Sequence, residues 1–294
     1  MEKKIKFFDK NIIRKREISD KNFQYIVGTT MPLPSEIEIS ESGTCNRVCS
    51  FCPRSDPNYK DIKEFITDDL HNKLCEELSA LNYAGVIRYS GFVEPLLDKN
   101  IYNLVKSARR SLPKSRIEIV TNGDVLNKER LIKLFESGLD TILISVYDSA
   151  EDAIKFEKLC LDCKLESSQY VIRHRYLPQE KDFGITMSNR AGMMVNAEYI
   201  IKPLKKKLNS ACYYPSYTFF MDYDGDVLMC PHDWGKKRIL GNLNKETFLN
   251  IWTSQLAETT RKRLNNSDRN FSPCNVCDVK GTLIGKKHAD AWGK

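Results

Sequence analysis

Apolar residues recur with a helical period in several segments of the first 200 residues. One face of the segment 67–81 carries Leu70, Leu74 and Leu78, and a Thr-Asp pair stands at the position of an N-terminal cap. Helices are therefore predicted in four segments: 67–81, 99–112, 127–138 and one that ends near Lys164.

Short runs of alternating or β-branched residues lie between these helices. Strands are predicted in five segments: 35–40, 85–91, 116–123, 141–148 and 170–176. Because a helix separates each strand from the next, neighbouring strands are expected to be parallel. The pattern predicts an α/β sheet or barrel, with functional residues gathered at the carboxyl ends of the strands.

Composition narrows the class of protein. The chain has 294 residues, of which 41% are hydrophobic and 10% aromatic, so it can form one large domain or a large and a small one. No apolar run approaches the roughly 18 residues of a membrane span, and the start of the chain is charged where a signal peptide is apolar. We therefore expect a cytoplasmic protein without membrane contact.

The net charge of +7 comes from 46 basic residues scattered among 39 acidic ones. The basic clusters at 201–208 and 260–264 lack interleaved aromatic residues, so a solvated surface is favoured over nucleic-acid binding. Ten cysteines in a reducing compartment indicate metal ligands before disulfides.

Three of these cysteines follow the first predicted strand. Cys45, Cys49 and Cys52 form a C-x3-C-x2-C pattern, and no fourth cysteine or histidine is near in sequence. A structural zinc site is closed by four ligands, whereas a 4Fe-4S cluster on three thiolates keeps one iron open. The spacing therefore favours an iron-sulfur cluster with one exchangeable position over a zinc knuckle.

The loop resembles the signature of the radical S-adenosylmethionine (SAM) enzymes, in which an aromatic residue, here Phe51, precedes the last cysteine. The segment 89–97 resembles the Gly-Gly-Glu-Pro motif of that family. Gly91 and Glu94 match it, while two inserted residues depart from it. The resemblance implies that Glu94 accepts from the amino group of the methionine moiety, although a surface carboxylate is the plain alternative.

Two more residues at strand ends fit the same family. Asn122 follows the third strand and Ser145, on the fourth, resembles the serine that contacts the ribose; a turn and an ordinary strand residue are the alternatives. Arg173 and Arg175 alternate with His174, so the arginines point together into the lumen, where they could hold a carboxylate, or together into solvent.

The family resemblance implies a partial (β/α)6 TIM-like barrel that binds S-adenosylmethionine. Cys45, Cys49 and Cys52 would hold the catalytic 4Fe-4S cluster, and a reductant such as flavodoxin or ferredoxin would supply the electron. The cofactor would then yield a 5'-deoxyadenosyl radical that removes a hydrogen atom from the substrate.

A second cysteine pattern lies in the last third of the chain. Cys212, Gly225, Cys230, Cys274 and Cys277 resemble the twitch domain, a shortened SPASM domain that holds an auxiliary 4Fe-4S cluster. Four ligands also suit a zinc ribbon, but the first two cysteines are too far apart for a zinc knuckle. With no cysteine after Cys277, the pattern predicts one auxiliary cluster, and two 4Fe-4S clusters in all.

The patterning of this region predicts a hairpin at 216–230 around an Asp-Gly turn, then a strand end and one long helix within 240–264. The organisation expected from the whole chain has three parts: an N-terminal extension at 1–34, the α/β barrel at 35–205, and an α+β twitch domain at 206–294.

Five residues have no settled assignment. Cys75 shares an apolar helix face and is expected in the core. Cys160 and Cys163 are interpreted as ordinary thiols, unless Cys163 faces the lumen and donates a hydrogen atom. His174 is expected to be packed, and Arg190, in the segment 188–192, could line the barrel mouth.

The expected substrate is a small polar molecule of the sugar or aminocyclitol type. Related enzymes oxidise, epimerise or deoxygenate carbinol carbons of such molecules, and others modify peptides. The N-terminal extension is too short for a leader-peptide module, which favours the small molecule. Oxidation is preferred to epimerisation, and a non-catalytic iron-sulfur or zinc protein is the alternative of another class.

Overall fold

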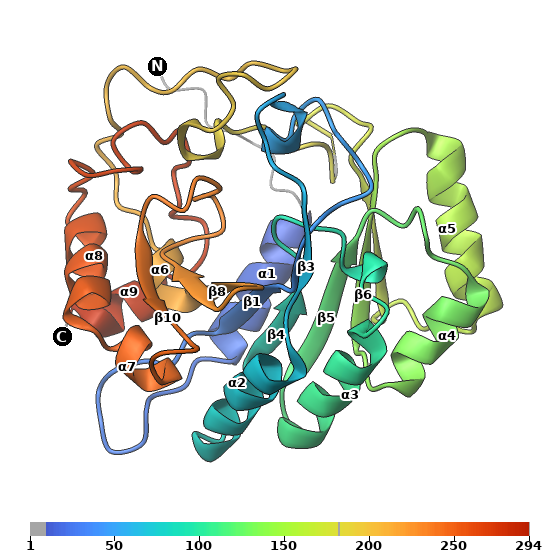
Figure 1. The fold of residues 1–294 in the computed structure, drawn as a ribbon, viewed down its shortest axis with the longest axis horizontal. Helices are drawn as coiled ribbons and strands as arrows, with labels where there is room; N and C mark the ends of the chain where they lie inside the picture. The colour runs from blue at the N-terminus through green and yellow to red at the C-terminus, as the bar shows by residue number, and fades with distance from the viewer. Residues whose placement is uncertain (1–9, 182, 294) are drawn as a thin grey trace.

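The structure is a computed structural model that describes residues 10–181 and 183–293. Within these residues the main sheet has eight strands in the order β10-β9-β8-β1-β4-β5-β6-β7 (Figure 1). The strands are β1 (Glu36–Ser40), β4 (Val86–Tyr89), β5 (Arg116–Thr121), β6 (Thr141–Val146), β7 (Tyr170–His174), β8 (Thr218–Asp222), β9 (Asp226–Leu228) and β10 (Ile239–Asn242). All pairings from β8 through β1 to β7 are parallel. The expected α/β barrel-like architecture is confirmed.

Four helices connect the parallel strands, as the apolar periodicity predicts. They are α2 (Asp68–Ala80), α3 (Ile101–Ser111), α4 (Lys128–Glu136) and α5 (Ala150–Asp162). Side chains of Thr67, Asn127 and Ser149 each accept a hydrogen bond from a backbone N–H of the first turn, so these residues fix where α2, α4 and α5 begin. Figure 1 shows α4 and α5 on the right of the strands, and α2 and α3 side by side below them.

The two faces of β1 differ in polarity. Ile37 and Ile39 are fully buried in the main apolar core, which also includes Leu74 of α2. Glu36 and Glu38 alternate with them and point to the opposite face. That face is the lumen of the open barrel, and it is polar because charged side chains meet there.

The C-terminal third continues the barrel sheet. β8 pairs with β1 in parallel, so the sixth parallel strand comes from the segment expected to form a separate domain. β8 and β9 form the predicted hairpin, and Gly225 in its turn has a φ of +86°, which glycine adopts at little cost. Because β8 belongs to this sheet, the auxiliary cysteines lie next to the barrel.

The prediction of one long helix within 240–264 is wrong. The segment forms β10 and two helices, α7 (Phe248–Trp252) and α8 (Gln255–Asn265). Ser254 interrupts them with an extended backbone and accepts a hydrogen bond from the N–H of Ala257 at 3.1 Å. Ser254 therefore acts as the N-terminal cap of α8, and a serine at such a cap is favoured over a serine inside a continuous helix.

Other short elements complete the chain. They are β2 (Ser42–Gly43), β3 (Ile62–Phe65), three short 3-10 helices at Pro53–Ser55, Pro95–Leu97 and Arg190–Gly192, α6 (Tyr214–Tyr217) and α9 (Lys286–Trp292). No helix within the described residues is both long and apolar enough to span a bilayer.

Helix α1 (Lys10–Lys21) was not predicted from the sequence. Figure 1 places it behind the strands, between the helices on the right and the group α7, α8 and α9 on the left. Arg14 forms an ion pair with Glu118 of β5, and the Arg16 Nε atom donates to the Leu283 carbonyl oxygen at 2.8 Å. Helix α1 therefore contacts both the barrel strands and the C-terminal segment.

Candidate active site

A cavity of about 370 Å³ opens at the carboxyl ends of the parallel strands. It is lined by all nine residues that the sequence assigned to the cluster or to the cofactor: Cys45, Cys49, Phe51, Cys52, Gly91, Glu94, Asn122, Ser145 and Arg173. They come from five different strands or the loops that follow them, so the fold brings together residues up to 128 positions apart. The cavity is large enough for a small-molecule site.

The three cysteines of the loop after β1 face this cavity. Burial first, and then the neighbouring thiols of Cys52 and Cys45, raise the pKa of the Cys49 thiol to about 12. Such thiols become ligands only when a cationic centre stabilises the thiolates. No other cysteine among the described residues lines the cavity, so the donor set fits an iron-sulfur cluster with one open iron.

Arg47 fixes the cluster loop against two neighbouring strand ends. Its Nε atom donates to Asp124 at 2.7 Å, and its Nη1 atom donates to Asp148 at 2.9 Å. The two aspartates follow β5 and β6, so this ion-pair group ties three loops together. Its guanidinium also lies 5.6 Å from the ring centroid of Tyr147.

Glu94 is buried in the cavity wall and already accepts three hydrogen bonds. Its Oε1 atom accepts from the N–H of Leu96 at 3.0 Å and from the hydroxyl of Thr121 at 2.5 Å, and Oε2 accepts from the N–H of Asn122 at 2.7 Å. Burial nevertheless raises the pKa of Glu94 to about 7. A carboxylate has about four acceptor positions, which leaves one for a bound amino group.

The alternation along β7 directs its arginines into the lumen. Arg173 and Arg175 both line the cavity, and the Nη1 atom of Arg173 donates to the Ser145 hydroxyl at 3.2 Å. His174 lies outside this lining and pairs with the Tyr176 hydroxyl at 3.0 Å. Of the two directions that the sequence left open for the arginines, the structure has the one into the lumen, and His174 packs against Tyr176 outside the cavity lining.

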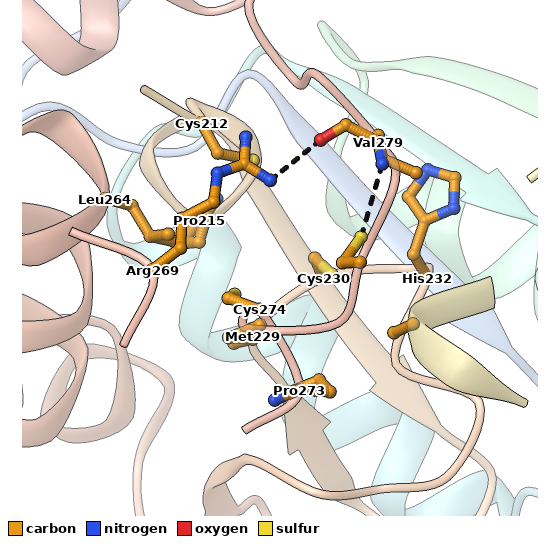
Figure 2. A pocket seen from close by; sticks show the side chains of 12 residues that line it. Cys212, Pro215, Met229, Cys230, His232, Leu264, Arg269, Pro273, Cys274 and Val279 are labelled. Carbon is orange, nitrogen blue, oxygen red and sulfur yellow. Dashed lines mark hydrogen bonds between the residues drawn. The ribbon is translucent and has the colours of Figure 1, made fainter. Parts of the chain in front are cut away.

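The four C-terminal cysteines surround a second, enclosed space of about 20 Å³. Figure 2 shows Cys212, Cys230 and Cys274 arranged around it, and Cys277 completes the lining. Burial raises the pKa of the Cys277 thiol to about 11, and burial raises those of the other three as well. Four buried thiols gathered around one space are a donor set that suits a cationic group.

Arg269 joins the two parts of the chain that supply these ligands. Its Nε atom donates to the Ser210 carbonyl oxygen at 2.9 Å, and its Nη1 atom donates to that of Val279 at 2.8 Å (Figure 2). The N–H of Val279 in turn donates to the Cys277 sulfur at 3.4 Å. At Gly281, a Cβ atom would lie 2.2 Å from the Cys212 sulfur, so glycine is required at this position.

The arrangement of the thiols favours a cluster over a single ion. Within the described residues, no three His, Cys, Asp or Glu side chains are close enough to hold one metal ion, as a zinc ribbon requires. Four thiols around a shared space instead match a core in which each of four irons takes one thiolate.

Comparison with known proteins agrees with this geometry. Residues 39–171 match the model described as the radical SAM superfamily, and residues 212–278 match that of an iron-sulfur cluster-binding domain, SPASM. A curated protein of Niallia circulans, S-adenosyl-L-methionine-dependent 2-deoxy-scyllo-inosamine dehydrogenase, is 31% identical over 83% of this chain and 92% of its own length. The chain belongs to the radical SAM superfamily.

Solved structures place this radical SAM chain among similar folds. A crystal structure of BtrN in complex with AdoMet and 2-DOIA has a TM-score of 0.71 and 27% identity, covering 87% of this chain and 98% of that one. A structure of anSMEcpe with bound AdoMet has a TM-score of 0.53 at 13% identity, covering 89% of this chain and 92% of that one, which shows the fold alone.

As a radical SAM enzyme with a SPASM domain, the chain uses S-adenosylmethionine and two 4Fe-4S clusters as cofactors, and it is an oxidoreductase. The two sites are adjacent. His232 lines both the cavity and the four-cysteine space, and burial lowers its pKa to about 3, so the imidazole is neutral.

Several residues that line this cavity of the radical SAM enzyme were not predicted from the sequence. They are Asn11, Ile12, Lys15, Glu36, Glu38, Arg88, Tyr147, Tyr214, His232 and Trp234. The alternation of side chains along β1 and β4 could have indicated Glu36, Glu38 and Arg88. No motif in α1 or in the loop after Cys230 indicates that these segments reach the cavity. Arg190 does line the cavity, in a strained loop where Arg190 and Ala191 have φ angles of 46° and 53°.

The three remaining cysteines lie outside both cavity linings. Cys75 is buried on α2, as predicted, and its sulfur lies 3.9 Å from the His71 ring nitrogens. Cys160 is fully buried in the main core, and Cys163 packs against that core. Neither Cys160 nor Cys163 lines the cavity.

Proposed function

We propose that this radical SAM enzyme oxidises a carbinol carbon of an aminocyclitol or a similar sugar-like molecule to a ketone. The relative BtrN supports this substrate class, because it is a 2-deoxy-scyllo-inosamine dehydrogenase and was crystallised with 2-DOIA. The observation that carries the proposal is the contact of the four-cysteine site with the cavity through His232. An oxidation must pass an electron on, and this site lies beside the substrate.

We assign Cys45, Cys49 and Cys52 to the catalytic cluster, and the four C-terminal cysteines to the auxiliary cluster. When bound, S-adenosylmethionine with the catalytic cluster supplies a 5'-deoxyadenosyl radical, and the auxiliary cluster supplies an acceptor for one electron.

The chain's own residues would orient the cofactor. Glu94 has one acceptor position left for the amino group, and the guanidinium of Arg173 can bind the carboxylate. Ser145 lies against Arg173, where its hydroxyl is available to the ribose, and Asn122 and Phe51 line the same part of the cavity. Gly91 has a φ of +100°, which allows the backbone after β4 to turn away from the cofactor.

The aromatic wall would keep water from the reacting carbon. Phe92 packs against Trp234 with ring centroids 4.4 Å apart and against Phe220 at 4.8 Å. Exclusion of water matters because it limits side reactions of a radical. For the electron that starts each turnover, we propose a small reductant such as flavodoxin or ferredoxin.

Epimerisation is less well supported, because it needs a hydrogen atom donor on the far face of the substrate. Among the described residues, the only cysteines in the cavity lining are those of the catalytic loop. Cys160 lies on α5 and Cys163 caps the end of that helix, and neither lines the cavity.

The test is anaerobic turnover with dithionite and S-adenosylmethionine. We expect slow formation of 5'-deoxyadenosine without substrate and faster formation with 2-deoxy-scyllo-inosamine, together with a ketone product. Cys49→Ala, as the control, should form no 5'-deoxyadenosine. If 2-deoxy-scyllo-inosamine and a panel of sugars and their phosphates all fail to accelerate the reaction, the proposed substrate class is wrong.

A further inference from the structure

Helix α1 forms part of the cavity wall although it lies outside both regions that match family models. Asn11, Ile12 and Lys15 line the cavity. Positions 11, 12 and 15 lie on one face of a helix, within a single turn, so one face of α1 is turned toward the space that a substrate occupies.

Contacts on either side hold α1 in this position. Arg14 pairs with Glu118 of β5, and the Ser19 and Ser35 hydroxyls share a hydrogen bond of 2.8 Å. The Arg16 bond to Leu283 adds the C-terminal segment. The helix is therefore fixed as a wall by residues other than those that face the cavity.

Lys15 brings a cation into the polar end of the cavity. Its Nζ atom lies 3.8 Å from Glu36 Oε1, and Glu36 is also paired with Arg88. About a quarter of the lysine side chain, 27%, stays accessible, and the residue lines the cavity. Burial first, and then the charge of Arg88, lowers the pKa of Lys15.

Glu38 lies two residues beyond Glu36 on the same face of β1. Its Oε1 atom accepts a hydrogen bond from the Ser90 hydroxyl at 2.6 Å, and no cation is paired with it among the described residues. Burial and the charge of Glu36 raise its pKa. The end of the cavity near α1 therefore offers the N–H donors of Lys15 and a carboxyl group.

We propose that α1 is a substrate-recognition element, in which Lys15 and Glu38 bind hydroxyl groups of a polyhydroxylated ring. A hydroxyl group can accept from Lys15 and donate to Glu38 at the same time. An ammonium group at this position would meet the cations of Lys15 and Arg88, and its attraction to the carboxyl groups is weak, because Glu36 is already paired with both cations and burial raises the pKa of Glu38. The inference rests on the proposed function and adds that hydroxyl groups, not an amine, face α1.

Binding measurements test this without turnover. Anaerobically reconstituted protein with S-adenosylmethionine and no reductant is titrated calorimetrically with 2-deoxy-scyllo-inosamine and with 2-deoxy-scyllo-inositol, in which a hydroxyl replaces the amine. Lys15→Met should weaken binding of both ligands by about tenfold or more, because a charged hydrogen-bond donor is lost. Lys15→Gln, which keeps a donor, should recover part of the loss.

Lys21→Met makes the same chemical change at an exposed position of α1 and should bind both ligands like the wild type. The affinity for S-adenosylmethionine, measured on each variant, separates a substrate effect from damage to the cofactor site. If Lys15→Met binds both ligands as tightly as the wild type does, the inference is overturned. If Lys15→Met binds 2-deoxy-scyllo-inosamine more tightly than the wild type does, an ammonium group faces Lys15 and the inference is also wrong.

The two proposals can fail separately. If the wild type binds neither cyclitol, both the substrate class and the role of α1 are wrong. If binding depends on Lys15 but turnover gives no ketone, the oxidation is wrong and the recognition by α1 stands. If a ketone forms and the Lys15→Met variant binds the cyclitols like the wild type, only the inference about α1 fails.

Discussion

Glu94 combines two tasks at one position. Its carboxylate holds the N–H groups of Leu96 and Asn122 and the hydroxyl of Thr121, and so joins the ends of β4 and β5. The same side chain lines the cavity where the family motif predicts contact with the cofactor. A substitution here removes an acceptor for the ligand and leaves buried donors without partners.

Glu94→Ala should therefore weaken S-adenosylmethionine binding by about 2 to 5 kcal/mol, because a buried charged hydrogen bond is lost. Glu94→Gln should lose less, since it retains one oxygen acceptor. The dissociation constants are measured anaerobically on reconstituted protein, with iron content as the control for an intact cluster. An unchanged affinity in Glu94→Ala would mean that the segment 91–95 serves only as a turn.

At the scale of elements, the repeating part of the fold was predictable. The strands and α2 to α5 follow the two periods of apolar residues, and their caps are local in sequence. Helix α1 was not predicted, because its contacts with the barrel are made by charged residues such as Arg14 and Lys15. The break at Ser254 was missed because a serine inside an apolar helical pattern is also compatible with a continuous helix.

The residues of the candidate site also fall into two groups, those that the sequence predicts and those that it does not. The seven cysteines assigned to the clusters belong to motifs with fixed spacing, and they and the assigned residues at strand ends all line one of the two spaces. Lys15, Tyr214 and His232 enter the cavity through the packing of distant segments, and no spacing in the sequence indicates that. Side chains from α1 and from the loop after β9 can be assigned only when the fold is known.

The position of α5 leads to a prediction about its thiols. Cys163 packs against the core from the outer helix and lies outside the cavity lining. Cys163→Ser should therefore form 5'-deoxyadenosine and product at the wild-type rate, with the product unchanged. Loss of product with continued 5'-deoxyadenosine formation would identify Cys163 as a hydrogen atom donor and would favour epimerisation.

At the scale of the whole molecule, one sheet carries both metal sites. β1 leads into the catalytic cysteines on one side, and β8 and β9 lead to Cys230 on the other. Cys212 precedes β8, and Cys230 follows β9, which is antiparallel to β8, so both lie toward the end at which β8 and β1 begin, whereas the catalytic cysteines follow the carboxyl end of β1. This topology places the auxiliary site beside the cavity without a flexible linker.

Iron content tests the division of ligands between the sites. Reconstituted wild-type protein should hold about eight irons, as two 4Fe-4S clusters. Replacing Cys45, Cys49 and Cys52 together with Ala should leave about four, because the auxiliary ligands come from a separate part of the chain. Loss of all iron from that variant, or stoichiometric zinc in the wild type, would contradict the assignment.

The mass of the product tests the central claim most directly. Turnover of 2-deoxy-scyllo-inosamine is carried out anaerobically in deuterium oxide, and the carbon-bound hydrogens of the product are counted by mass spectrometry. If the auxiliary site accepts an electron from the substrate, the product is a ketone that has lost two hydrogens. A product of unchanged formula that carries one solvent-derived deuterium on carbon would show that the substrate radical is quenched by a hydrogen atom, and would contradict the account.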